Sequence, residues 1–454
     1  MPIAFLFSAR PTAASVLVLL LAGCVANQPY RLGGIADDIY AGQKPHFEET
    51  MVSSDRSVRL SFVEFDEKGD FWDRRQLGKT SRYIRDAKKP VLLVLFIHGW
   101  HHNAADRKPG GKNPGDVETF QRLLAELAMS DSTRHLQVHG VYIGWRGRLV
   151  QGPLDYLTFL DRKGAATRVA GTPVTETIFQ LIRQARKYHQ GSKCVVIGHS
   201  FGALVLEKAM AQAMTGSLLA QDVQSRGQPV SAPADLILLV NSAAESIYAK
   251  EMKDMFARMP HRGTVTADRP LLISMTSKSD TATKTYFPLG TFLPNLFAHR
   301  RYQWDDKYDN ASHQVDQNEY LTQTPGHNLH LWSHDTVPSD PPDSASSVAL
   351  LTRQENATEP PSESNPAFEE NLRHPRGLVF ATSDRDNPDH FKWWRLTKVG
   401  GNPTTPYWVI HVPDEIIHGH APIFTPEGRA MMAALFRITN PKTEPGARTM
   451  TVSD

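Results

Sequence analysis

The segment Gly198-His199-Ser200-Phe201-Gly202 has residue types and a spacing that suit nucleophilic catalysis. It fits the pattern G-x-S-x-G, in which a serine stands on a sharp turn between a strand and a helix. A buried strand is predicted directly before it, over 193–197, and a helix directly after it, over 203–210. Both glycines suit this turn, because the strand and the helix nearly touch there. We therefore expect Ser200 to be a nucleophile whose hydroxyl stands clear of a sheet.

A second segment, His98-Gly99-Trp100-His101-His102-Asn103, suits the stabilisation of an oxyanion. It directly follows the apolar run 91–97, which predicts a strand. A loop between such a strand and a helix can supply a backbone N–H donor for the negative charge that develops on a carbonyl oxygen. We expect the backbone N–H groups of Trp100 and Phe201 to be the two donors. The three histidines also invite a metal interpretation, but no carboxylate or cysteine lies at a spacing typical of zinc sites. We predict no metal ion and no organic cofactor.

These motifs resemble those of serine hydrolases of the α/β-hydrolase fold, of an esterase or lipase-like kind. The loop with the sequence His-Gly-Trp-His-His-Asn is similar to that of poorly characterised bacterial members. The resemblance rests on that loop, on Gly198–Gly202, on an acid segment around Asp280 and on a histidine segment around His420, which span 91–436 in the family's chain order. It implies a mostly parallel central sheet with helices on both faces, and esterase-type chemistry by a Ser-His-Asp triad. It implies no particular substrate.

The acid of such a triad follows a late strand and orients the histidine. The run 271–275 predicts such a strand, and Asp280 lies in the loop that leaves it, so Asp280 is the expected acid. Glu245 is the main alternative, because it follows the strand predicted at 236–240 and some members of the fold carry the acid one strand earlier. Asp414 is a third candidate.

The base must follow the acid in the chain and lie after the last strand. A strand is predicted over 407–412, and the loop 415–424 follows it. We expect His420 to be the base, because Gly419 frees the backbone before it and an apolar segment behind it anchors the loop. His418 would share the same side of an extended loop and stays open. Two histidines of an earlier cluster are outside candidates: His327 and His334.

The elements that must position these residues alternate between short apolar strands and amphipathic helices. The run Val91–Ile97 contains seven apolar residues, which is typical of a strand covered on both faces in a parallel sheet. Further strands are predicted at 136–143, 194–197, 236–240, 271–275, 377–381, 391–396 and 407–412, and helices at 120–129, 175–188, 203–214 and 427–437. This alternation predicts a doubly wound α/β sheet.

The segment 148–174 lies between a predicted strand and the helix that precedes the nucleophile. It combines Tyr156, Phe159 and Leu160 with basic residues. Two interpretations stay open, a lid or pocket wall over the sheet and a plain connecting helix.

The N-terminus predicts export. Arg10 precedes an apolar run, 13–22, that is too short to span a bilayer and reads as a removable signal. The sequence Leu21-Ala22-Gly23-Cys24 resembles the lipobox of bacterial lipoproteins, in which the cysteine is diacylated and becomes the first mature residue. We therefore expect lipidation at Cys24 and a lipid-anchored protein of the cell envelope. Val25, which is not acidic, favours the outer membrane where one exists.

The charge balance of the chain bears on its partners. The 50 basic and 48 acidic residues give a net charge of +2 without a dense basic run, so nucleic-acid binding is not expected.

Composition also indicates how the chain is divided into domains. Residues 335–375 are rich in Pro, Ser, Asp, Glu and Asn, which favours an excursion from the fold. The predicted division is a signal peptide (1–23), a flexible tether (24–57), the first part of an α/β-hydrolase domain (58–334), a low-complexity insertion (335–375), the closing part of that domain (376–440) and a tail (441–454).

The sequence thus predicts a serine hydrolase that cleaves carboxylic esters through an acyl-enzyme at the bacterial cell envelope. Its expected partners are a small-molecule or lipid ester and, through lipidated Cys24, the membrane. The alternative is a non-catalytic envelope lipoprotein that uses the same fold as a binding or assembly module. The sequence indicates no protein partner.

Overall fold

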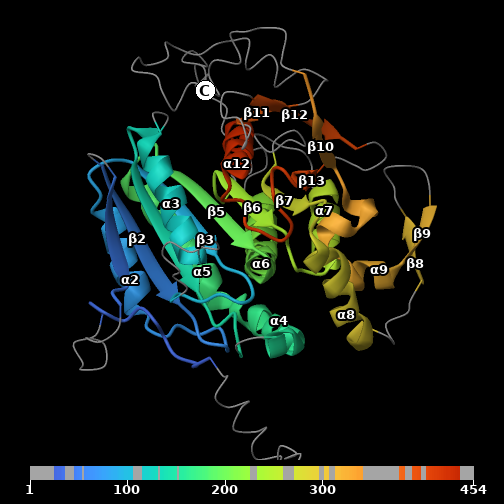
Figure 1. Cartoon of the computed structure of the whole chain (residues 1–454), viewed down its shortest axis with the longest axis horizontal. Helices are drawn as coiled ribbons and strands as arrows, with labels where there is room; N and C mark the ends of the chain where they lie inside the picture. The colour runs from blue at the N-terminus through green and yellow to red at the C-terminus, as the bar shows by residue number, and fades with distance from the viewer. Residues whose placement is uncertain are drawn as a thin grey trace, which may run out of the picture.

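A single open sheet of eleven strands runs through the computed structural model of the chain (Figure 1). The order of its strands is β1-β2-β4-β3-β5-β6-β7-β13-β10-β12-β11. The structure describes residues 25–35, 45–53, 56–105, 115–130, 133–150, 153–224, 233–258, 270–295, 301–305, 312–340, 378–383, 391–399 and 405–439. The predicted signal peptide, Cys24, most of the predicted insertion and the predicted C-terminal tail lie outside these residues.

Eight neighbouring strands of the sheet are parallel. In spatial order they are β2 (Arg56–Glu64), β4 (Gln137–Gly144), β3 (Val91–Ile97), β5 (Lys193–His199), β6 (Leu236–Val240), β7 (Leu272–Ser277), β13 (Tyr407–Val412) and β10 (His334–Pro338). Antiparallel strands extend both edges: β1 (Glu48–Ser53) beside β2, and β12 (Phe391–Lys398) with β11 (Leu378–Ser383) beside β10. The protein is therefore a mixed α/β structure with a large, mostly parallel sheet.

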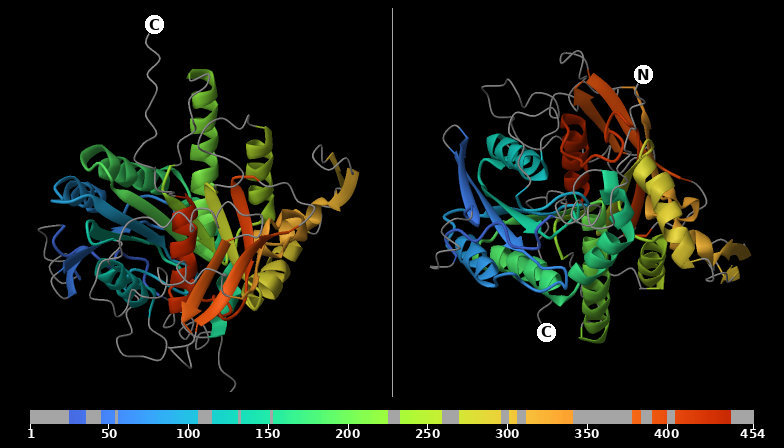
Figure 2. Two further views of the ribbon diagram at one scale, coloured as in Figure 1. Left: turned by 90° about the horizontal axis from the view of Figure 1, so that it is seen from above. Right: turned by 60° about the horizontal axis from the view of Figure 1, so that its bottom comes forward.

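Helices cover both faces of this sheet (Figures 1 and 2). Leu93, Leu95 and Ile97 of β3 belong to one apolar core, whereas Leu92 and Phe96 of the same strand belong to the other. The first core is closed by α2 (Arg75–Arg85), α5 (Thr172–Tyr188), α6 (Phe201–Gln224) and α7 (Ser246–Arg258), and the second by α3 (Asp116–Met129) and α12 (Pro426–Thr439). The seven-residue apolar run predicted this double burial, because alternate side chains of a strand point to opposite faces.

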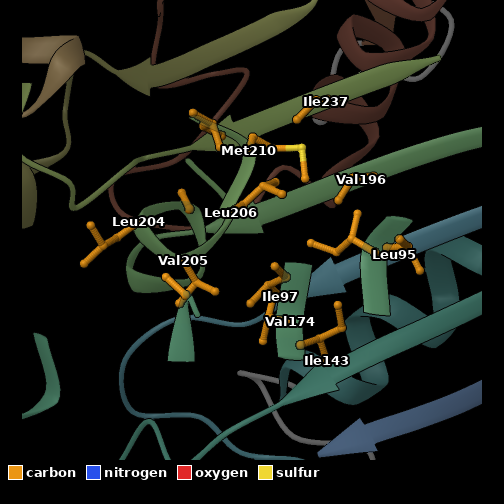
Figure 3. Close-up of a cluster of buried hydrophobic side chains, with 14 of the residues drawn as sticks. Leu95, Ile97, Ile143, Val174, Val196, Leu204, Val205, Leu206, Met210 and Ile237 are labelled. Atoms are coloured by element: carbon orange, nitrogen blue, oxygen red, sulfur yellow. The ribbon is translucent and has the colours of Figure 1, made fainter. Parts of the chain in front are cut away.

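The first core packs the start of α6 onto the sheet. Leu206 and Met210 of α6 pack with Ile97 of β3, Val196 of β5 and Ile237 of β6 (Figure 3), and all five side chains are fully buried or nearly so. Burial of each such side chain contributes about 1.5–3 kcal/mol relative to exposure. The start of α6 is therefore held firmly over the sheet.

The fold also contains several shorter elements, some of which contribute buried residues such as Ala165, Val169 and Phe287 to the first core. These elements are η3 (Pro153–Thr158), α4 (Phe159–Val169), a π-helical turn η4 (Ala282–Tyr286), α8 (Phe287–Asn295), the hairpin β8 (Arg301–Asp305) and β9 (Ser312–Asp316), α9 (Gln317–Thr322), η5 (Pro325–His327) and η6 (Leu329–Leu331). In Figure 1, α4 and α8 lie on the lower side of the molecule. None of the helices in the described part of the chain is long and apolar enough to span a membrane.

The prediction of a flexible tether over 24–57 is wrong for the residues that the structure describes. β1 is the edge strand of the sheet, and Phe47 before it is buried. Arg31 is also buried: its guanidinium lies 2.6 Å from a Glu49 oxygen and 4.1 Å from the centroid of the Phe62 ring. The polar composition of this segment suggested solvation, but its charged groups are paired inside the fold.

The predicted start of the insertion at 335 is also wrong. Residues 334–338 form β10, which lies inside the sheet between β13 and β12, and Thr336 is buried. The strands predicted at 377–381, 391–396 and 407–412 are confirmed as β11, β12 and β13. β10 was missed because its Asp, Thr and Pro residues resemble those of the following polar segment, and strand pairing rather than propensity places them.

Candidate active site

Ser200 lies on the sharp turn that was predicted between β5 and α6. Its φ angle is +55°, a left-handed conformation that is strained for a residue with a side chain. A Cβ atom on Gly198 would lie 2.6 Å from the carbonyl oxygen of Gly202, and one on Gly202 would lie 2.1 Å from that of Ile97. Only glycine fits at either position, so the spacing of the motif follows from the close contact of the strand, the helix and β3.

Three side chains from distant parts of the chain meet at the carboxyl edge of the sheet. The Oγ atom of Ser200 lies 2.8 Å from Nε2 of His420, and Nδ1 of His420 lies 2.8 Å from Oδ2 of Asp280. An ionised carboxylate only accepts hydrogen bonds, so Nδ1–H of His420 donates to Asp280 and its Nε2 accepts from the serine hydroxyl. The predicted Ser200, Asp280 and His420 are therefore brought together in the order that lets the imidazole withdraw the serine proton.

Asp280 is fully buried and fixed on several sides. Its Oδ1 accepts from the backbone N–H groups of Ala282 and Thr283, and its Oδ2 accepts from the Thr283 hydroxyl at 2.5 Å. Burial raises the pKa of this carboxyl, but the hydrogen bond and charge of His420 and the hydrogen bonds of Thr283 outweigh it, so the pKa lies below its usual value. The turn of η4 directly after Asp280 thus supplies donors that keep the acid ionised.

The loop that carries His420 is held by His199, which the sequence placed in the G-x-S-x-G motif without this role, and by Asn241, which sequence reasoning did not assign to the site. Nε2 of His199 lies 2.9 Å from the backbone carbonyl oxygen of His420 and donates to it. The side-chain amide of Asn241 donates to the carbonyl oxygens of Gly419 and Ala421, at 3.1 and 3.0 Å. The backbone carbonyls of three consecutive residues are therefore held by side chains at the ends of β5 and β6.

Asn241 also links this loop to β7. It directly follows β6, has a φ angle of +46°, and accepts from the backbone N–H of Ser277 at 2.9 Å through Oδ1. Asparagine tolerates the left-handed conformation better than most residues, which suits it to this position. Its place directly after a predicted strand was the signal available in the sequence, since polar residues at the carboxyl ends of parallel strands gather at one edge.

The loop after β3 lies against the nucleophile. A Cβ atom on Gly99 would lie 2.8 Å from Cβ of Ser200, so the backbone of this loop lies directly against the turn that carries Ser200. Nε2 of His98 accepts from the backbone N–H of Trp145 at 3.0 Å, and its Nδ1 lies 2.9 Å from the carbonyl oxygen of Gly99. The neutral, fully buried His98 ring thus supports the loop from within.

The two backbone groups predicted as oxyanion donors belong to the residues that directly follow Gly99 and Ser200. Phe201 is the first residue of α6, so its N–H has no acceptor within the helix and lies at the positive end of the helix dipole. Trp100 directly follows Gly99, and the centroid of its ring lies 6.0 Å from that of Phe201. The fold therefore brings these two residues close together.

The alternative acids and bases occupy other positions. Glu245 forms an ion pair with Lys163, and Asp414 accepts from Nδ1 of His418 at 2.6 Å and from the N–H of Gly419 at 3.0 Å. The His418 side chain is 78% exposed. Asp414 therefore shapes the loop that carries His420, rather than contacting the His420 ring.

The two outside histidines also lie away from the Ser200 hydroxyl. His334 lies on β10, where its ring packs on Trp408 with 4.0 Å between centroids. Nε2 of His327 lies 3.0 Å from the Thr283 hydroxyl, which itself donates to Asp280. Burial lowers the pKa of His327 to about 4, so it stays neutral beside the acid.

The segment 148–174 forms η3 and α4 beside the site. The Phe159 ring of α4 lies 5.4 Å from that of Phe201 and 5.5 Å from that of Trp100, between centroids. Tyr156 of η3 contacts the other edge of Trp100, at 5.9 Å. Residues 153–169 are therefore helical, and they line the region around Ser200 with aromatic rings.

The three histidines of the loop after β3 have separate partners. His98 supports the loop as above, His101 lies 2.5 Å from Asp155, and His102 lies 3.7 Å from Asp116. Among the described residues, no group of three or more His, Cys, Asp or Glu side chains is placed to hold a metal ion.

Comparison of the whole chain with protein families and with curated proteins found no match.

Proposed function

We propose that this protein is a serine hydrolase of the α/β-hydrolase fold that cleaves carboxylic esters. The single observation that carries the proposal is the pair of 2.8 Å contacts that link Ser200, His420 and Asp280. Several further features support it: the positive φ of Ser200, the chain order serine, acid, histidine, and a sheet whose parallel strands end at the site. The proposed reaction uses only protein groups and water.

In the proposed reaction, Oγ of Ser200 attacks the acyl carbonyl carbon while Nε2 of His420 takes the hydroxyl proton. The carbonyl oxygen becomes an oxyanion, which accepts from the N–H groups of Phe201 and Trp100. Asp280 stabilises the imidazolium and holds its orientation. The tetrahedral intermediate then expels the alkoxide, which receives the proton from His420, and Ser200 is left acylated.

The second half of the reaction repeats these roles with water. Nε2 of His420 takes a proton from water as the water oxygen attacks the acyl-enzyme carbonyl, and the collapse of that intermediate returns the proton to Oγ of Ser200. Esters are proposed rather than amides because an alkoxide is the easier leaving group.

The test is covalent labelling with a fluorophosphonate probe, combined with hydrolysis of an activated p-nitrophenyl ester. We expect the probe to attach at Ser200, as located by peptide mass spectrometry, and both labelling and hydrolysis to be lost in Ser200→Ala. The other serines of the same chain are the internal control. Circular dichroism checks that the protein is folded. Absence of labelling in folded protein would overturn the proposal in favour of a non-catalytic module.

We also propose that Cys24 is lipidated and that the protein resides at the cell envelope. The lipobox-like segment Leu21-Ala22-Gly23-Cys24 supports this. A diacylated and N-acylated cysteine supplies more than the two hydrophobic signals that stable anchoring requires. Cys24→Ser is expected to release the protein from the membrane fraction, and unchanged fractionation would contradict the anchor.

A further inference from the structure

The exposed large apolar side chains of the protein are concentrated on one surface. Six of the nine found among the described residues lie on η3 and α4 or on η4 and α8. These six are Tyr156, Leu157, Leu160, Tyr286, Leu289 and Phe292, with Leu157 at 83% and Leu289 at 67% exposure. We call them the apolar surface. Monomeric soluble proteins rarely expose such a set together without an interaction that covers it.

The two halves of the apolar surface are in contact with each other. A Cβ atom on Gly290 of α8 would lie 2.6 Å from the Phe159 ring of α4, and the Phe159 and Phe287 rings are 6.1 Å apart between centroids. In Figures 1 and 2, α4 and α8 lie on the same side of the molecule. The six residues therefore form one surface rather than scattered exposures.

This surface is continuous with the candidate active site. Phe159 contacts Phe201, the residue after the nucleophile, and Tyr156 contacts Trp100. The turn η4 begins two residues after Asp280. A lipid layer that covered the surface would thus lie beside the proposed oxyanion donors and the acid.

Val25, the residue after the predicted lipidation site, contacts the chain just before η3. The N–H of Val25 donates to the carbonyl oxygen of Leu149 at 2.8 Å, and the Arg146 guanidinium donates to the carbonyl oxygen of Val25. The next residue, Val150, lies with its N–H 3.5 Å from Asp155, in the turn that carries Tyr156 and Leu157. Val25 is therefore held close to η3, and no long described tether separates the residue that follows the proposed lipidation site from the apolar surface.

We propose that the apolar surface docks on the phospholipid bilayer that holds the anchor, and that the site receives its esters from that bilayer. This rests on the proposed lipidation and hydrolase activity. Leucine side chains supply area for insertion among acyl chains, and Tyr156 and Tyr286 suit the interface because each has an apolar ring and a polar tip. Two signals, the acyl group and the apolar surface, then fix the orientation of the protein. The carboxyl edge of the sheet, where Ser200 lies, faces the lipid.

The test locates the surface that meets the lipid, without using catalysis. In the full chain carrying Cys24→Ser, a fluorescent NBD group is attached to Leu157→Cys or to Leu289→Cys, and to Met129→Cys or Tyr188→Cys as matched controls. The control positions, each 46% exposed, end α3 and α5 at the opposite edge of the sheet. Cys194 does not compete for the label, because it is buried and burial raises the pKa of its thiol to about 12.

Vesicles of phosphatidylethanolamine and phosphatidylglycerol are then added. We expect NBD emission to shift to the blue, and to be quenched by spin-labelled lipid, at 157 and 289 but not at 129 or 188. No shift at 157 and 289, or equal shifts at all four positions, would overturn the docking proposal. So would a shift at 157 and 289 that needs no vesicles and grows with protein concentration, which would indicate a second copy of the chain.

The same measurement in Ser200→Ala separates this proposal from the proposed activity. Docking requires no nucleophile, so the pattern of shifts is expected to be unchanged in that variant. A hydrolase that labels with fluorophosphonate but shows no lipid contact at 157 and 289 would leave the proposed function standing and refute the docking surface alone.

Discussion

His199 holds the backbone of His420: its Nε2–H donates to the carbonyl oxygen of that residue at 2.9 Å, and the two rings are 5.2 Å apart between centroids. The residue directly before the nucleophile thus fixes the residue that faces the nucleophile. Burial, followed by the nearby charge of His420, lowers the pKa of His199 well below its usual value, so this ring stays neutral. Its role in the site is to position His420 rather than to carry a proton.

We therefore expect His199→Ala to lower kcat for an activated ester by about 10- to 100-fold, because displacement of a catalytic group by about 1 Å costs on the order of 100-fold. KM is expected to change little, since the ring of His199 lies behind the base. His199→Gln places an amide nitrogen near the position of Nε2 and should recover most of the loss. Steady-state kinetics of the three proteins give the answer, and wild-type kcat in the alanine variant would refute the positioning role.

The assignment of the base gives a second prediction. His420→Ala is expected to lower turnover of a p-nitrophenyl ester by several orders of magnitude, and to leave about 10³- to 10⁴-fold catalysis over water from the remaining site. The melting temperature should stay close to that of the wild type, because the His420 side chain is 31% exposed and carries little packing.

His418→Ala is the matched control for this prediction. Its side chain is 78% exposed and bonded to Asp414, so most of the turnover should remain. The double variant should be no slower than His420→Ala alone, since residues that act in one unit are not additive. If His418→Ala were inactive and His420→Ala active, the base would be His418 rather than His420.

The acid is tested by Asp280→Asn. The amide keeps the volume of the side chain and an acceptor oxygen, but it no longer provides the charge that stabilises the imidazolium, and its NH₂ group favours the wrong tautomer of His420. We expect kcat to fall by about 10⁴-fold. Glu245→Gln, which alters the main alternative acid, is the control and should retain most activity. The reverse result would move the acid to the end of β6.

The central strands, the turn at Ser200 and the site residues could be predicted because each leaves a local signal. Val91–Ile97 is apolar at every position, whereas a half-exposed strand alternates apolar and polar residues, and Gly198 and Gly202 mark a turn that admits no Cβ atom. Asp280 and His420 each follow a late strand, and the registers of β5, β6, β7 and β13 bring the ends of those strands to one edge.

The parts that failed depend on partners that lie far away in the sequence. β10 has a polar composition, and it is a strand because β13 and β12 pair with it on both sides. The segment around Arg31 is folded because Glu64, more than thirty residues later, accepts from its backbone at 2.7 Å and Glu49 pairs with its side chain. The contacts of Asn241 and His199 were missed for the same reason, since their partners on the His420 loop follow by about 180 and 220 residues.

Asn241 yields a prediction that separates positioning from packing. In Asn241→Asp the side chain keeps its acceptor for the Ser277 N–H, but it loses both donors and sets a carboxylate oxygen against the carbonyls of Gly419 and Ala421. We expect a larger loss of kcat than in Asn241→Ala, although aspartate is the closer match in size. If the alanine variant is the slower of the two, side-chain volume rather than hydrogen bonding maintains the loop.

The last prediction concerns stability and pH. Glu207 of α6 is fully buried, where the Tyr407 hydroxyl donates to its Oε1 at 2.6 Å and the Ser242 hydroxyl lies 3.3 Å from its Oε2. Burial raises the pKa of this carboxyl from 4.5 to about 7, against the opposing effect of these hydrogen bonds. The folded protein therefore holds a proton at Glu207 over a pH range in which the unfolded chain has lost it.

Because the folded state binds more protons between pH 4.5 and about 7, the free energy of unfolding must fall as the pH rises through that window. The contribution of Glu207 is on the order of 3 kcal/mol, from about 1.4 kcal/mol per pKa unit. Glu207→Gln stays neutral at all these pH values while keeping an acceptor for Tyr407 and a donor for Ser242. We expect the variant and the wild type to have similar stability at pH 4.5 in urea unfolding, and the variant to be the more stable by that order of magnitude at pH 8. A constant difference between the two proteins across this range would show that Glu207 has the same proton occupancy folded and unfolded, and would contradict the prediction.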